Sequence, residues 1–123
     1  MQFQARLSAS VALALSLVGA PLLAQASPAH VAGLWCGAGL LHEFSLEIAQ
    51  REQSVVGRLV RKDKIREITG RVEGDRLHTD THRDHSMDLR VDGDALRITG
   101  ATGVLALATG QFFTRAPGAT CTS

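Results

Sequence analysis

Aromatic residues are scarce in this 123-residue sequence, which has no tyrosine, one tryptophan and four phenylalanines. Charge of either sign is also not in excess, because 13 basic and 12 acidic residues leave a formal net charge of +1. Proteins that bind nucleic acid usually combine a basic surface with aromatic residues on which bases stack. We therefore expect no nucleic-acid partner, and the same scarcity disfavours an aromatic sugar-binding groove.

Long apolar runs are absent except near the N-terminus. There Arg6 precedes the apolar or small run Leu7–Ala20, Pro21 follows it, and Ala24-Gln25-Ala26 forms a small-x-small site. This order of features is typical of a secretory signal peptide.

We predict that residues 1–26 are a signal peptide and that 27–123 form one small β-barrel domain. The alternative is an uncleaved anchor, but the run is interrupted by proline and falls short of the about 20 apolar residues of a spanning helix. The expected location is periplasmic or secreted, with membrane contact only through the signal peptide before cleavage.

Cysteine is limited to Cys36 and Cys121, near opposite ends of the predicted domain. Two cysteines in an exported protein favour one disulfide over two free thiols. Because so small a domain buries a limited apolar core, such a crosslink would matter for its stability.

No segment after residue 26 shows the 3.6-residue period of a long helix. Short runs with alternating apolar and polar residues are separated by polar or glycine-containing turns, which is typical of antiparallel strands. The expected runs are Val31–Ala38, His42–Gln50, Ser54–Arg61, Ile65–Val72, Arg76–Thr81, Ser86–Val91, Ala95–Gly100 and Val104–Arg115.

This pattern predicts an all-β fold, an eight-stranded antiparallel up-and-down β-barrel whose first and last strands are joined by the disulfide. A two-sheet β-sandwich is the alternative. The positions expected to face inward are Leu34, Phe44, Leu46, Ile48, Val56, Ile68, Leu77, Met87, Leu89, Val91, Leu96, Ile98, Leu105, Leu107 and Phe112.

The inward residues are mostly mid-sized and aliphatic, so an interior cavity would be narrow and apolar and would suit an acyl chain or another small hydrophobe. The residues expected to line it are Phe44, Leu46, Ile48, Met87, Leu89, Leu96, Ile98 and Phe112.

Gly33-Leu34-Trp35 at the start of the meander resembles the Gly-x-Trp signature of lipocalin-like (calycin-type) barrels. The resemblance implies that Trp35 plugs one end of the barrel and that a basic residue near the last strand lies across its ring. Arg115 stands where that residue is expected. Binding of a small apolar or amphiphilic ligand is the function that the resemblance implies.

A hairpin rich in histidine and aspartate carries the candidate metal ligands His78, Asp80, His82 and His85. His78 and His82 lie about 13 Å apart along a strand, too far to share an ion bound at about 2.1 Å. Neighbouring pairs remain, so the hairpin is either a weak metal site or simply a solvated polar turn.

Charge is uneven along the chain, with seven basic and three acidic residues in Arg51–Arg71 but three basic and seven acidic in Val72–Asp94. The electric field of such a charge distribution can steer a charged partner. Alternatively, the side chains of opposite charge pair across neighbouring strands on a solvated face.

Three functions from different classes follow. The first is an exported barrel that binds a small apolar or amphiphilic ligand. The second is a periplasmic protein-interaction module, such as an inhibitor of an envelope enzyme or an assembly accessory, acting through charged hairpins that include Arg61, Lys62 and Lys64. The third is a metal-binding protein. No nucleophile motif or phosphate loop is present, so we expect neither an enzyme nor a cofactor.

Overall fold

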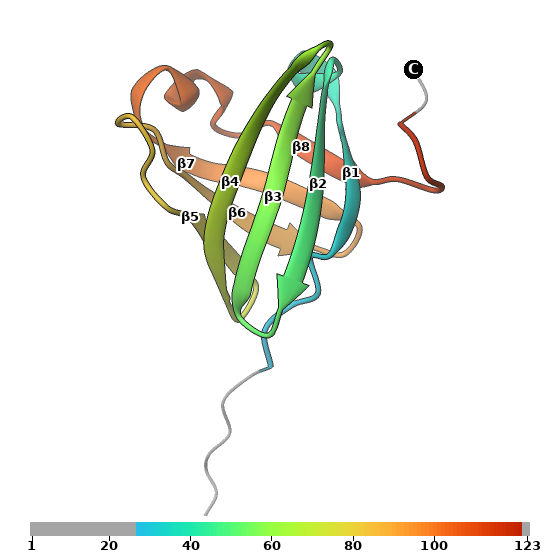
Figure 1. The fold of residues 1–123 in the computed structure, drawn as a ribbon, viewed down its shortest axis with the longest axis vertical. Coiled ribbons are helices and arrows are strands. Elements are labelled where there is room, and N and C mark those ends of the chain that lie inside the picture. The colour runs from blue at the N-terminus through green and yellow to red at the C-terminus, as the bar shows by residue number, and fades with distance from the viewer. Residues whose placement is uncertain (1–26, 122–123) are drawn as a thin grey trace, which may run out of the picture.

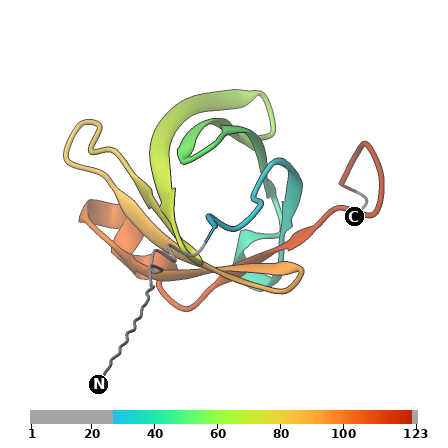
Figure 2. The same cartoon turned by 90° about the horizontal axis from the view of Figure 1, so that it is seen from below.

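The computed structural model describes residues 27–121, so the predicted signal peptide of residues 1–26 lies outside the described residues. Eight strands form a closed antiparallel barrel in which each strand pairs with its neighbours in sequence and β1 pairs with β8 (Figures 1 and 2). The strands are β1 (Gly33–Gly37), β2 (Phe44–Arg51), β3 (Ser54–Arg61), β4 (Lys64–Glu73), β5 (Arg76–Thr79), β6 (Met87–Asp92), β7 (Ala95–Ala101) and β8 (Phe112–Arg115). The predicted up-and-down barrel is confirmed.

Two short 3-10 helices, η2 (Gly39–Leu41) and η3 (Gly103–Ala108), interrupt the meander. Among the described residues, no helix is both long enough and apolar enough to cross a bilayer.

The barrel closes where β1 meets β8. Trp35, Cys36 and Gly37 lie opposite Arg115, Thr114 and Phe113 in antiparallel register. The segment after β8 then folds back so that Cys36 and Cys121, 85 positions apart in sequence, form a disulfide. The predicted crosslink between the first strand and the C-terminal region is confirmed.

Tight turns set the register of the hairpins. Gly74 and Gly93 have φ values of 60° and 63°, and Glu52 and Lys62 adopt similar values of 56° and 57° in the two preceding hairpins. Positive φ at this position matches the twist of two-residue hairpin loops. A fixed register decides which side chains enter the core, because a slip of one residue would turn every side chain to the other face.

Every second side chain along a strand points into the barrel, and most of these side chains are apolar. The buried apolar residues are Val31, Trp35, Leu41, Leu46, Ile48, Val55, Val72, Leu77, Met87, Leu89, Leu96, Ile98 and Phe113. Phe44, Ile68, Val91 and Leu105 are half-buried and pack against them.

Four positions expected to face inward do not. Val56 is 57% exposed while Val55 is buried, and Phe113 is buried while Phe112 lies beneath the Arg97 guanidinium at 5.1 Å. In each of these pairs either residue fits the hydrophobic pattern. The register set by the turns decides which of the two enters the core. Leu34 lies on the outer face because its neighbour Trp35 points inward.

The fourth is Leu107, which is 84% exposed on η3. The expected strand Val104–Arg115 is wrong over its first half, because η3 occupies Gly103–Ala108 and β8 begins only at Phe112. Gly103 and Gly110 have φ values of 64° and 91°, so the chain turns at both ends of this apolar run. Periodicity alone does not separate a short apolar strand from a helical segment.

Removing the disulfide should lower stability without changing the fold. In the chain-entropy model a loop of this length contributes at most roughly 4–5 kcal/mol. We expect the double variant Cys36→Ser with Cys121→Ser to unfold at a clearly lower denaturant concentration, with an equal or larger m-value because the unfolded chain without the crosslink is less compact. A free energy of unfolding within about 0.5 kcal/mol of the parent would contradict this role.

Candidate functional site

One end of the barrel, the lower end in Figure 1, is filled by protein. The Trp35 side chain is 0% exposed, and its indole N–H donates to the Val31 carbonyl oxygen at 2.9 Å. The Arg115 guanidinium lies 4.2 Å from the centroid of the Trp35 ring and donates to the Ala32 and His30 carbonyl oxygens at 3.2 and 3.1 Å. The structure therefore places the Arg115 guanidinium over the face of the Trp35 ring.

The lead-in to β1 completes this closure, and Figure 2 shows it crossing the lower opening. Val31 is fully buried. The Gln50 side chain holds the lead-in, since its Oε1 accepts from the Val31 N–H at 2.7 Å and its Nε2 donates to the Ala29 carbonyl oxygen at 2.9 Å.

The opposite end holds a cavity of about 280 Å³, which we call the mouth cavity. Its floor is apolar and consists of residues on β3, β4, β6 and η3. These are Leu59, Ile68, Met87 and Leu105. Its rim is polar, with Arg66, Glu67, Thr69, Asp80, Thr81, His82, His85 and Ser86. The cavity thus joins an apolar floor to a polar rim.

Of the residues expected to line a cavity, Met87 lines this one. Leu46, Ile48, Leu89, Leu96 and Ile98 are at most 6% exposed and pack against one another in the core. Phe44 is half-buried with Arg61 over its ring at 5.4 Å. Hydrophobic periodicity identified inward positions, but it carried no information about which of them would be left without a packing partner.

Leu59 and Thr79 also lie in this region, although neither was expected to line a cavity. Thr79 is 3% exposed, and its hydroxyl oxygen accepts from the Met87 N–H at 2.7 Å, which fixes the start of β6 beside the cavity. Asp80 accepts from the Thr69 hydroxyl at 2.6 Å. These contacts hold the rim in place where β4 and β5 separate.

The four candidate metal ligands do not converge. His78 bonds to Asp88, and His82 and His85 face each other across a turn through reciprocal backbone hydrogen bonds of 2.8 and 2.9 Å. The buried Nδ1 of His85 has no hydrogen-bond partner. Within residues 27–121, no three His, Cys, Asp or Glu side chains are grouped so that they could hold a metal ion.

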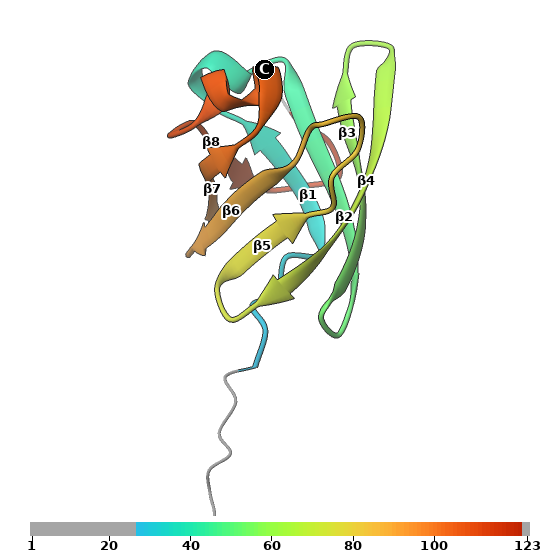
Figure 3. The same cartoon turned by 90° about the vertical axis from the view of Figure 1, so that its left-hand side faces the viewer.

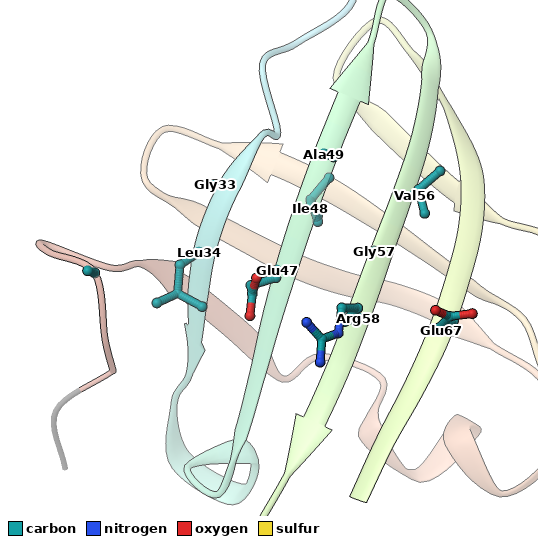
Figure 4. A pocket seen from close by; sticks show the side chains of 10 residues that line it. Gly33, Leu34, Glu47, Ile48, Ala49, Val56, Gly57, Arg58 and Glu67 are labelled. Carbon is teal, nitrogen blue, oxygen red and sulfur yellow. The ribbon is translucent and has the colours of Figure 1, made fainter.

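A second depression, of about 500 Å³, lies on the outer face of β1–β3 and is shown in Figure 4. Leu34, Ala49 and Val56 supply its apolar part. Arg58 lies between Glu47 on β2 and Glu67 on β4 in the cross-strand register. Such opposite charges stabilise one another across a sheet. Because the charged residues of this groove are paired in this way, the groove is a weaker candidate for a binding site than the mouth cavity.

The basic hairpin between β3 and β4 is partly neutralised by Glu43, which lies just before β2. Glu43 contacts Arg61 at 3.2 Å and Lys62 at 3.7 Å. The charge of Lys62, followed by the hydrogen bond from Arg61, lowers the pKa of Glu43 below its ordinary value. Two of the three basic residues predicted for partner binding are therefore already engaged with an acidic neighbour.

The Arg115–Trp35 contact should be worth more than an ordinary surface ion pair. A cation over an aromatic ring contributes about 0.5–2 kcal/mol, and two carbonyl contacts add to it. We expect Arg115→Met to lower the free energy of unfolding by roughly 1–3 kcal/mol. The matched control is Arg90→Met, because Arg90 makes an exposed pair with Asp75 at 3.0 Å that should be worth at most about 1 kcal/mol. Equal losses in the two variants would contradict the assignment.

Comparisons with models of known protein families, with curated proteins and with solved structures found no match.

Proposed function

We propose that this protein is an exported small β-barrel that binds a small apolar or amphiphilic ligand in the mouth cavity. The observation that carries the proposal is the difference between the two ends of the barrel. One end is filled by Trp35, Arg115 and the lead-in. The other has an apolar floor beneath a polar rim.

The size of the cavity limits the ligand. About 280 Å³ is just below the usual 300–1,000 Å³ of small-molecule sites. At about 30 Å³ for each water, it corresponds to roughly nine water molecules. A short acyl chain or a single ring matches this volume.

The residues that line the mouth cavity determine how the ligand is oriented in it. Leu59, Ile68, Met87 and Leu105 would cover the apolar part of the ligand, and burial of that area from water would drive binding. The polar group would stay at the rim. Export is supported by the predicted signal peptide and by the Cys36–Cys121 disulfide, which is typical of oxidising compartments.

Filling the cavity should abolish binding. Octanoate is a suitable probe because it joins a short acyl chain to one polar group. Leu105 and Leu107 both lie on η3, but only Leu105 lines the cavity and Leu107 is 84% exposed. We expect Leu105→Trp to weaken octanoate binding at least about tenfold in NMR titrations and Leu107→Trp to leave it unchanged.

Native mass spectrometry of the protein purified from its own host should also reveal a bound small molecule. The proposal fails if the parent shows no shifts at the floor residues with octanoate at about 10 mM, a limit that corresponds to less than about 3 kcal/mol of binding. It also fails if both tryptophan variants bind as the parent does.

A further inference from the structure

One half of β4 has a free edge. β4 pairs with β3 along Lys64–Arg71, but with β5 only from Gly70 to Glu73. β4 has 10 residues and β5 has 4, so β4 runs past the end of its neighbour, as Figure 3 shows. The segment 64–68 is paired on one side only.

The register identifies which backbone groups are free. Val72 donates its N–H to Gln53 on the β3 side, whereas Thr69 accepts from the Asp80 N–H on the β5 side. Because successive residues in an antiparallel strand direct their backbone groups to opposite sides, Arg66 and Ile68 bond to β3. Ile65 and Glu67 therefore direct their N–H and C=O groups to the unpaired side.

The chain after β5 leaves this edge open for a local reason. His82 and His85 bracket a tight turn in which Arg83 and Asp84 have φ values of 50° and 65°. Pairing with β4 ends at Gly70 and Thr79, with one more backbone hydrogen bond from Asp80 to Thr69, and the turn lies between this point and β6. The resulting cleft between the edge and the turn is lined by Arg58, Ile65, Arg66, Glu67, His82 and Arg83.

The cleft is basic, and Arg66 and Arg83 are its available cations, since Arg58 lies opposite both Glu47 and Glu67 in the cross-strand register. Three arginines, Arg58, Arg66 and Arg83, face one acidic residue, Glu67. Within residues 27–121, none of the three takes part in an ion pair within 4.0 Å. On its inner side the edge borders the mouth cavity, since Arg66 and Glu67 line both.

We propose that the free edge of β4 binds an extended acidic segment of a partner protein, which adds to the barrel as a further strand. Strand addition satisfies unpaired edge groups, and the adjacent surface selects the sequence. On the side that faces the mouth, the partner places an apolar residue beside Ile68 and acidic residues beside Arg66 and Lys64. A bound strand covers the cleft above the mouth cavity.

A second copy of this chain is a poor occupant of the same edge. Antiparallel pairing of two β4 edges would bring Lys64 and Arg66 of each copy together. Like charges placed opposite each other on paired strands are destabilising, and lysine on an edge is a recognised defence against such self-pairing. Charge complementarity therefore favours an acidic partner.

The first measurement is residue-resolved amide hydrogen exchange of the free protein. We expect the Ile65 and Glu67 amides to exchange fast, and those of Arg66 and Ile68, which bond to β3, to be protected. On addition of the capped peptide Thr-Leu-Thr-Asp-Val-Asp, the Ile65 and Glu67 amides should become protected. A peptide with lysine in place of both aspartates should bind at least about tenfold more weakly.

Variants separate strand addition from simple charge attraction. Glu67→Pro removes one outward N–H and no bond to β3, and proline is tolerated on a strand edge whose N–H faces solvent. We expect it to weaken peptide binding about tenfold, while Glu67→Ala, which keeps the N–H, binds at least as well as the parent. Arg66→Glu should weaken binding and Arg76→Glu, at the opposite end of β5, should not.

The proposal is overturned if the acidic peptide does not bind at about 1 mM. Equal binding of the lysine peptide also overturns it, as does a dimer that forms through β4 as protein concentration rises. These readouts do not depend on octanoate, so failure of ligand binding in the mouth cavity leaves this test intact.

Discussion

The pairing of β1 with β8 determines most other features of this fold. It makes the meander a closed barrel, and it brings Arg115 over Trp35. The same pairing starts the return of the chain toward Cys36, where the disulfide fixes the C-terminal segment. A domain of this size has a small hydrophobic core, so a guanidinium over an indole and one long-range crosslink are substantial parts of its stability.

With β1 paired to β8, the two open ends of the barrel differ in how they are filled. The lead-in fills one end and hydrogen-bonds to Gln50. At the other end the strands differ in length, and β4 extends beyond β5. The mouth cavity and the free edge of β4 both arise from this difference in length, because a residue that has lost its neighbouring strand has also lost part of its packing. The proposed ligand site and the proposed partner site are thus two consequences of one feature.

Much of the fold could be predicted from the sequence, because alternation and turn residues are local signals. Leu46, Leu89, Leu96 and Ile98 are inside as their patterns predict. Prediction failed where local signals are ambiguous. Val55-Val56 and Phe112-Phe113 offer two apolar neighbours, so that only the turn registers decide between them. The apolar run after Gly103 is compatible with either a helical segment or a strand.

The candidate site was less predictable, for a different physical reason. Whether an inward residue is packed or lines a cavity depends on strand lengths and on what lies across the barrel. Leu59 and Ile68 look like other inward positions in the sequence, yet they line the mouth because β5 ends early. The free edge of β4 likewise depends on the turn at Arg83 and Asp84, which no periodicity reveals.

The central claim is that the barrel is packed at one end and has an accessible apolar cavity at the other. Xenon titration monitored by methyl NMR tests it directly, because xenon enters apolar cavities without needing a polar contact. We expect shifts concentrated at the methyl groups of Leu59, Ile68, Met87 and Leu105, with those of Leu46 and Leu96 unaffected. Shifts centred on Leu46 and Leu96, or no shift at the mouth, would contradict it.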